Sequence, residues 1–184
     1  VRNPLYDARE VFLFECYTGI RISDILTLKW KHITDEKISI RMRKTEKLLT
    51  IPINDYVRSV LDRRRCAVEN NGGKITSEKY VFNILKVDVD EVSAQDALNA
   101  ISSATAVINK QLKKIAEQAN IDKNLSTHCA RHSYATALLT NNIPLPVIKE
   151  MLGHSDIKVT QIYAKVVDSK RNEVVECLNK VYHG

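Results

Sequence analysis

The sequence predicts a mainly helical domain with one small antiparallel β-sheet, which is the α+β class. Three observations lead to this prediction. Apolar residues recur at intervals of three and four along most of the chain, as one face of an α-helix requires. Two neighbouring segments, residues 37–43 and 48–53, alternate strictly between apolar and polar residues, as half-buried strands do. The length of 184 residues is enough for one domain with a sizeable core.

The chain is expected to open with two helices and a β-hairpin. A first helix over residues 6–19 ends at Gly19, and its inward face is formed by Val11, Phe14 and Tyr17. A short helix over residues 21–30 follows. The inward faces of the two strands carry Ile38, Ile40 and Met42, and Leu49, Ile51 and Ile53. The polar sequence KTEK between the strands makes them a hairpin.

A third helix is expected directly after the hairpin. Asn54 or Asp55 suits its N-cap, and the pattern continues over residues 56–69. The sequence NNGG that follows ends it. Residues 79–84 then form a short extended segment.

The remainder of the chain reads as helices. A long one over residues 94–119 is expected to break near Ser102 and Ser103, and its apolar stripe is Leu98, Ile101, Ala104, Ile108, Leu112 and Ile115. Ser126 or Thr127 caps the next helix. Three more helices are expected over residues 144–153, 156–166 and 169–182.

The composition favours an anionic partner. The net charge is +6, and basic residues cluster at residues 41–44, 63–65 and 110–114. Taken singly, each cluster is more typical of a solvated face. No apolar run approaches the roughly 20 residues of a membrane span, and no signal peptide opens the chain.

The four cysteines are far apart and form no CxxC motif, so a secreted disulfide framework is not expected. Free thiols in a reducing cytoplasm are the expectation.

The stretch STHCARHSYATALL raises two alternatives. His128 and His132 are four residues apart, like the paired zinc ligands of a helix. A zinc site needs a third ligand, and a zinc hydrolase carries a glutamate where Cys129 stands. A metal site is therefore not expected, and His132 is interpreted as a core or supporting residue. His128 and Arg131 instead share a helix start, which suits a phosphate group.

Residues elsewhere in the chain add to this interpretation. Arg21 stands in TGIR, His154 in LGHS, and Tyr163 nine residues after His154. With HCAR and a lysine on the hairpin, these boxes occur in the order typical of one family. Over residues 6–181 the sequence resembles the tyrosine recombinase (phage integrase) family, and most closely the integrases of mobile elements.

Two residues are assigned by comparison with the family pattern: the lysine of the hairpin and an acidic residue near Arg21. The family's hairpin lysine often lies eight residues before a proline in the second strand. Lys44 lies eight before Pro52, so it is preferred, with Lys47 as the alternative. Asp24 matches an acidic residue that orients the cations of the site; its alternative is an aspartate on a helix surface.

The resemblance implies DNA strand cleavage and rejoining. Tyr163 would attack the phosphodiester, leaving a 3′-phosphotyrosine and a free 5′-hydroxyl. The phosphate oxygens would be held by Arg21, Arg131 and His154. His128 would accept or relay the tyrosine proton, and Lys44 would protonate the departing 5′-oxygen. No cofactor and no metal ion are implied.

The resemblance also implies partners. Double-stranded DNA with att-type or inverted-repeat sites is expected, with the remaining basic residues on its backbone. Residues 1–184 would be one catalytic domain, without the core-binding or arm-binding domains of the family. Residues 169–182 would dock on a neighbouring protomer in a tetrameric synapse, or pack on their own core. Relaxation of DNA by a type IB topoisomerase and an inactive DNA-binding module remain the alternatives.

Overall fold

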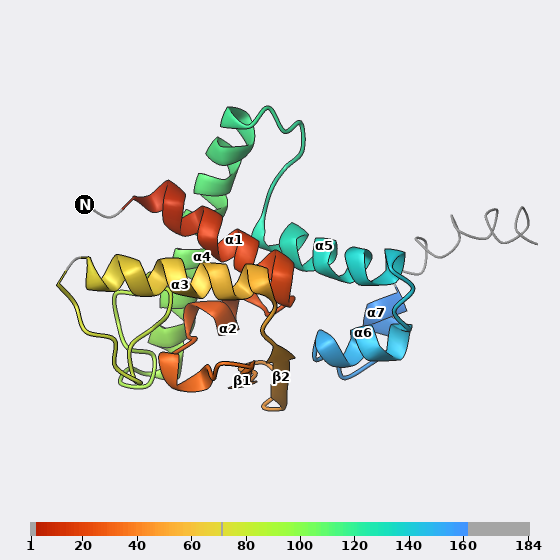
Figure 1. Ribbon diagram of the computed structural model, residues 1–184, viewed down its shortest axis with the longest axis horizontal. Helices are drawn as coiled ribbons and strands as arrows, with labels where there is room; N and C mark the ends of the chain where they lie inside the picture. Colours follow the sequence, from red (N-terminus) through yellow and green to blue (C-terminus); the bar gives the residue numbers. More distant parts are fainter. Residues whose placement is uncertain (1–2, 71, 162–184) are drawn as a thin grey trace, which may run out of the picture.

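A computed structural model describes residues 3–70 and 72–161 of the chain. Its elements, in chain order, are α1 (Pro4–Thr18), α2 (Ile22–Leu26), the 3₁₀ helix η1 (Trp30–His32), β1 (Lys37–Arg41), β2 (Leu48–Pro52), α3 (Asp55–Glu69), α4 (Ala94–Gln118), α5 (Thr127–Thr140), α6 (Leu145–Met151) and α7 (Lys158–Gln161) (Figure 1). The predicted fold class is confirmed. Within the described residues, no helix has the length and apolar character needed to cross a membrane.

Helix α1 is the central element and packs against α3, α4 and α5. It begins two residues earlier than predicted because the Asn3 side chain accepts hydrogen bonds from two amide groups of the first turn, where Pro4 also stands. It ends, as predicted, at Gly19, whose φ of 65° is in the left-handed region. A Cβ at Gly19 would collide with the ring of Tyr134, so this glycine also lets α1 and α5 approach closely.

The hairpin forms with the predicted alternation. Strands β1 and β2 are antiparallel, and Ile38 lies opposite Ile51 while Ile40 lies opposite Leu49. These four side chains and Met42 are buried. Because side chains alternate between the two faces of a strand, the register sends one apolar row into the core.

The predicted helix over residues 21–30 is wrong beyond Leu26, where α2 ends. The backbone of residues 28–31 instead pairs with a distant segment: Leu28 accepts from the Val81 amide, and the Trp30 amide donates to Lys79. The segment over residues 79–84, expected to be extended, contributes one isolated bridge, between Lys29 and Tyr80. A long-range pairing therefore replaced a local helical preference.

Helix α3 is capped by Asn54, one of the two predicted caps. The predicted break near Ser102 and Ser103 is wrong, because α4 is continuous from Ala94 to Gln118. Both serines face solvent, where serine costs a helix only a few tenths of a kcal/mol. Leu98, predicted to face inward, is 58% exposed; the neighbouring Ala97 occupies the buried position.

Two hydrophobic cores result. The larger one joins α1, α2, the hairpin, α3, the segment around Val81 and Phe82, and α4. The smaller one lies between α5 and α6 and is formed by Tyr134, Ala135, Leu139, Ile148 and Leu152. We call residues 3–119 the main body and residues 127–153 the α5–α6 lobe. Figure 1 shows the lobe projecting to one side of the main body.

Candidate functional site: a cluster of cations at the seam between the two cores

Arg21 lies where the main body meets the lobe. It is the N-cap residue of α2 and has extended backbone geometry, which turns its side chain away from the helix axis. Its Nη1 lies 3.2 Å from the sulfur of Met42 on the hairpin. Its Nη2 donates to the carbonyl of Gly153 at 3.4 Å. A half-buried guanidinium thus contacts both sides of the seam.

Arg131 crosses the seam from the other side. It projects from the second turn of α5 and is buried. Its Nη1 donates to the carbonyl of Gly19 and its Nη2 to the carbonyl of Leu152. These carbonyls belong to the main body and the lobe, respectively, so Arg131 links the two regions directly.

His154 follows α6, just beyond Gly153. Its Nδ1 lies 2.9 Å from the hydroxyl of Thr160 in α7. Burial lowers the pKa of His154 to about 4, and the charges of Arg131, Arg21 and Lys44 act in the same direction. This ring is therefore neutral at pH 7, and it lies within the electrostatic reach of three cations.

The two histidines of α5 contact each other. The Nε2 atoms of His128 and His132 are 2.7 Å apart, and the rings are nearly perpendicular. His128 is exposed, whereas His132 is half-buried. Burial, followed by the charges of His128 and Arg131, lowers the pKa of His132. The two histidines therefore form one unit on the surface of α5. Within the described part of the chain, no group of three histidine, cysteine or carboxylate side chains could hold a metal ion.

Asp24 is buried in α2, so the alternative of an aspartate on a helix surface is wrong. Its Oδ1 accepts a hydrogen bond from the Arg43 amide at 2.9 Å, which ties α2 to the end of β1. Burial raises its pKa, while the Arg43 amide and the charges of Arg21 and Arg131 oppose that shift. Its Oδ2 has no hydrogen-bond partner among the described residues. Asp24 therefore lies within the field of both arginines, and its direct bond goes to the hairpin backbone.

The two hairpin lysines differ in their relation to the site. Both are exposed and lie in the turn between β1 and β2. Lys44 is one of the three cations whose charge lowers the pKa of His154. Lys47 takes part in the hairpin through its backbone: its carbonyl accepts a hydrogen bond from the Met42 amide. Tyr163 and residues 169–182 lie outside the described residues.

Glu15, which lies in α1 near Arg131, was not predicted as a site residue. Its side chain is buried, and its Oε2 has no hydrogen-bond partner within residues 3–70 and 72–161. Burial raises the pKa of Glu15 to about 9, against the opposing charge of Arg131. A signal was present: Glu15 stands four residues after Val11, on the apolar stripe of the helix.

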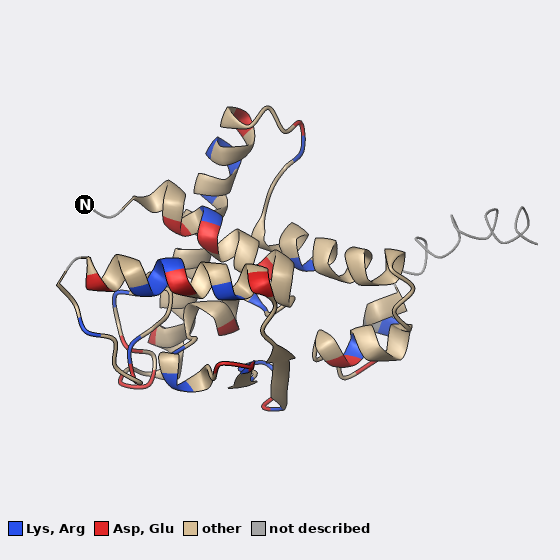
Figure 2. Cartoon of the chain, in the orientation of Figure 1, with Lys and Arg blue, Asp and Glu red and all other residues tan. Residues whose placement is uncertain are grey.

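The basic cluster at residues 63–65 is structural. Arg64 is buried and forms a 2.7 Å ion pair with Asp7 on α1. Arg63 pairs with the buried Glu10 of the same helix. Figure 2 shows acidic and basic residues interspersed along α3. The expectation that the remaining basic residues bind the DNA backbone is therefore wrong for Arg64, which is buried and paired with Asp7.

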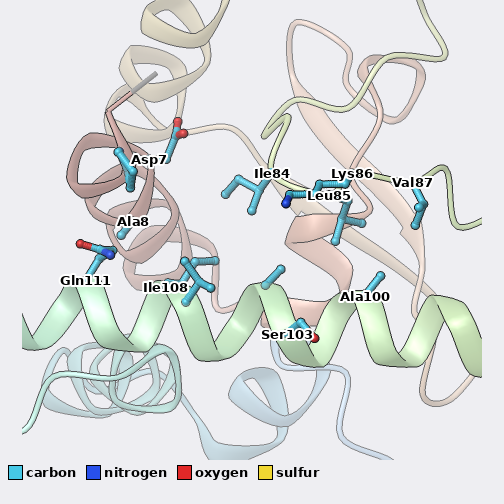
Figure 3. A pocket seen from close by; sticks show the side chains of 13 residues that line it. Asp7, Ala8, Ile84, Leu85, Lys86, Val87, Ala100, Ser103, Ile108 and Gln111 are labelled. Atoms are coloured by element: carbon cyan, nitrogen blue, oxygen red, sulfur yellow. The ribbon is translucent and has the colours of Figure 1, made fainter. Parts of the chain in front are cut away.

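Two further features bear on earlier expectations. The cysteines that the structure describes, Cys16, Cys66 and Cys129, are free thiols. An apolar cavity of about 470 Å³ lies between α1, α4 and the segment over residues 84–87 (Figure 3). The predicted site residues do not line it. The seam, rather than this cavity, is the candidate site.

The seam brings together Arg21, Arg131, His154 and Lys44, with Asp24 beneath them. Cations held in fixed positions, partly out of water, can stabilise negative charge that develops on a bound group. Phosphate oxygens match the planar fork of an arginine, and two arginines can hold them in two directions. The arrangement therefore suits a phosphodiester in which charge builds up during reaction.

Comparison with known proteins shows the family of the chain. Among curated proteins, the tyrosine recombinase XerD of Staphylococcus haemolyticus is 31% identical over 169 residues, which cover 90% of this chain and 52% of that protein. XerD of Halalkalibacterium halodurans is 49% identical over 65 residues, covering 35% of this chain and 22% of that protein. The chain therefore spans about half the length of the Staphylococcus haemolyticus protein.

Solved structures share the fold. The recombinase XerH, bound to its palindromic difH substrate in a post-cleavage complex, gives a TM-score of 0.67 at 22% identity and covers 95% of this chain and 47% of that one. The catalytic domain of bacteriophage HP1 integrase gives 0.55 at 23% identity and covers 94% and 88%. The Tn1549 transposon integrase, in complex with circular intermediate DNA, gives 0.54 at 19% identity and covers 90% and 59%. Residues 4–170 match the phage integrase family, so this chain belongs to that family of tyrosine recombinases.

Proposed function

We propose that this chain is the catalytic domain of a site-specific DNA recombinase, which cleaves and rejoins DNA through a covalent 3′-phosphotyrosine at Tyr163. The observation that carries the proposal is the convergence of Arg21, Arg131 and His154 at the seam, from three separate parts of the chain. The substrate follows from chemistry: two guanidiniums and further donors suit a phosphodiester. The XerH and Tn1549 relatives in complex with DNA support the same substrate class.

The seam residues act on the phosphate. Arg21 and Arg131 hold the nonbridging oxygens, and His154 adds a neutral donor. Nδ1 of His154 lies 2.9 Å from the Thr160 hydroxyl; in the tautomer in which Nδ1 accepts from this hydroxyl, Nε2 carries the hydrogen and donates to the phosphate. Preorganised donors of this kind are each worth on the order of 10²–10³ in rate. Asp24 positions the hairpin beside them through its bond to the Arg43 amide.

Two proton transfers complete the reaction. His128 accepts or relays the proton of Tyr163, whose unperturbed pKa of about 10 makes it a poor nucleophile at pH 7. Lys44 gives a proton to the departing 5′-oxygen, because an alkoxide is a poor leaving group. The electrostatic action of Lys44 on His154 supports choosing Lys44 over Lys47. The tyrosine later leaves as the 5′-hydroxyl attacks, and the strand is resealed without a nucleotide.

The larger assembly is part of the proposal. Residues 1–184 act as a single catalytic domain. Double-stranded DNA with att-type or inverted-repeat sites is the substrate, and residues 169–182 join protomers in a tetrameric synapse. The integration or excision of a mobile element is the expected outcome, at the bacterial nucleoid.

A nicked suicide substrate tests the cleavage step. We expect wild-type protein in EDTA to form a denaturant-resistant adduct with the 3′ end of the cleaved strand. Tyr163→Phe removes the attacking oxygen and should abolish the adduct. Tyr134→Phe is the matched control, because Tyr134 is buried in the small core, and this variant should retain adduct formation. An adduct that survives Tyr163→Phe would contradict the proposal. Relaxation of supercoiled DNA without strand exchange would favour the topoisomerase alternative.

A substrate with a 5′-thio leaving group tests the proton donor. A thiolate leaves without protonation, so it should restore cleavage by Lys44→Ala to within about tenfold of wild type. Restoration of Lys47→Ala alone would move the role to Lys47.

A further inference from the structure

The two histidines of α5 have a geometry that their expected roles do not require. Their Nε2 atoms face each other at 2.7 Å. Two lone pairs repel at that distance, so one of the two nitrogens must carry a hydrogen that it donates to the other. The pair therefore already shares one electrophile, a proton, between two imidazole nitrogens.

We propose that His128 and His132 form an exchangeable site for a divalent late first-row transition metal, such as nickel(II) or zinc(II), which replaces the shared proton. Neutral imidazole is a ligand that these metals favour. Metal–nitrogen bonds of about 2.0–2.1 Å, at angles between a right angle and a tetrahedral one, place two ligand nitrogens about 2.9–3.4 Å apart. The existing pair, at 2.7 Å, needs to open by roughly 0.2–0.7 Å.

Helical spacing supports the same site. Residues four apart lie on one face of a helix, and paired histidines at that spacing hold zinc in HExxH proteins. Both histidines belong to the continuous helix α5, which fixes their relative position. His128 is exposed, so a metal ion can reach it from solvent.

The site differs from a structural or catalytic zinc site in its number of ligands. Those sites use three or four protein ligands. Here two histidines act, and water completes the coordination. The positive charge of Arg131, which acts on His132, disfavours the binding of a metal cation at this residue. The metal is therefore held more weakly than in a structural site, and it exchanges with the medium.

Occupancy has a consequence that rests on the proposed function. A metal ion bound to Nε2 of His128 occupies the lone pair that would accept the proton of Tyr163. Metal binding would thus inhibit DNA cleavage, and chelators would restore it. DNA cleavage by this protein would then need no metal ion, and a metal ion bound at the histidine pair would inhibit it.

Isothermal titration of the full chain with nickel(II) alone tests the site. We expect a histidine-dependent 1:1 binding event that is at least about tenfold weaker in His128→Gln and in His132→Gln. His32→Gln is the matched control, because His32 lies in η1 and is half-buried; it should bind nickel(II) like wild type. Circular dichroism checks that each variant is folded, and His128, being exposed, provides a variant that leaves the core untouched. Equal affinity in all four proteins, or no saturable binding by wild type, would overturn the site.

The suicide-substrate assay tests the consequence. Nickel(II) at a concentration that saturates the titrated site should slow adduct formation about 10²-fold or more, and EDTA should reverse the effect. An unchanged rate at saturation would overturn the inhibition. Failure of the proposed function has a different signature, which is the absence of adduct in EDTA.

Discussion

The main body and the α5–α6 lobe are built in different ways. The main body buries side chains from four helices and the hairpin in one continuous core. The lobe has a core of five buried residues. Since burial of apolar surface is the main source of folding free energy, the lobe has little of its own to keep it ordered. Its position depends on contacts with the main body.

Helix α5 packs on α1, and two of the proposed catalytic residues add hydrogen bonds across the seam. Arg131 donates to carbonyls of both regions, and Arg21 reaches the carbonyl of Gly153. Gly153 in turn lies against Met42 of the hairpin. The comparison teaches that the proposed site is also part of the joint, by which we mean the contact between the main body and the lobe. Side chains that would bind phosphate help to hold the smaller region on the larger one. Activity and docking of the lobe should therefore change together.

The largest effect is expected at Arg131. Arg131→Ala removes a proposed phosphate ligand and leaves two buried carbonyls, those of Gly19 and Leu152, without this donor. Cleavage of a suicide substrate should fall by about 10²–10³-fold or more, and the free energy of unfolding by about 1–3 kcal/mol. Hydrogen exchange should show faster opening of α5 and α6 than of α1.

Arg131→Lys separates the two roles. A lysine keeps the charge but cannot reach both carbonyls with a planar fork. It should recover part of the cleavage rate and little of the exchange protection in the lobe. Full protection of the lobe in Arg131→Ala would show that the joint lies elsewhere.

An effect on stability alone, opposite in sign, is expected at Glu15, on the main-body side of the joint. Its pKa is about 9 in the folded protein and about 4.5 when unfolded, because folding buries it. The folded carboxyl is therefore neutral at pH 7, while the unfolded one is ionised. This difference destabilises the folded state progressively as the pH rises from about 4.5 to about 9.

Glu15→Gln removes the titrating group while keeping its shape. The variant should be more stable than wild type at pH 7 by about 3 kcal/mol, because 2.5 pH units separate the unfolded pKa from pH 7, at about 1.36 kcal/mol each. Denaturant unfolding at several pH values measures the difference, which should shrink toward pH 4.5. A stability gain independent of pH would contradict this account.

The smallest effect is expected at Gly153. Its φ is 61°, and an added Cβ would collide with the Met42 side chain. Gly153→Ala should lower the free energy of unfolding through both the backbone strain and the displaced methionine. Gly72→Ala is the matched control, since Gly72 has a φ of 70° with open space around its Cβ position. We expect Gly153→Ala to cost about 1–3 kcal/mol more than Gly72→Ala by thermal unfolding. Equal losses in the free energy of unfolding would mean that the contact between Met42 and Gly153 does not stabilise the position of the lobe.

Local patterns in the sequence predicted much of the fold. Helical periodicity located α1, α3, α4 and α5, and Asn54 and Ser126 were among the predicted caps. Strict alternation located both strands. These features depend on neighbours within a few residues, which a sequence displays directly.

The errors and omissions concern distant partners. The helix over residues 21–30 ended early because its backbone pairs with residues 77–81. Arg64 became buried because Asp7 lies beside it, 57 residues away. The partners of Arg131 are backbone carbonyls, which any residue carries and no motif reveals. The role of Tyr163 stays a prediction, carried by its spacing from His154.

Mapping the covalent adduct by mass spectrometry tests the central claim most directly. Wild-type protein is trapped on a suicide substrate in EDTA and digested with nuclease and protease, and the modified peptide is sequenced. The account predicts a nucleotide-bearing phosphate on Tyr163, attached to the 3′ end of the cleaved strand. An adduct on any other residue, or one attached to a 5′ end, would contradict it.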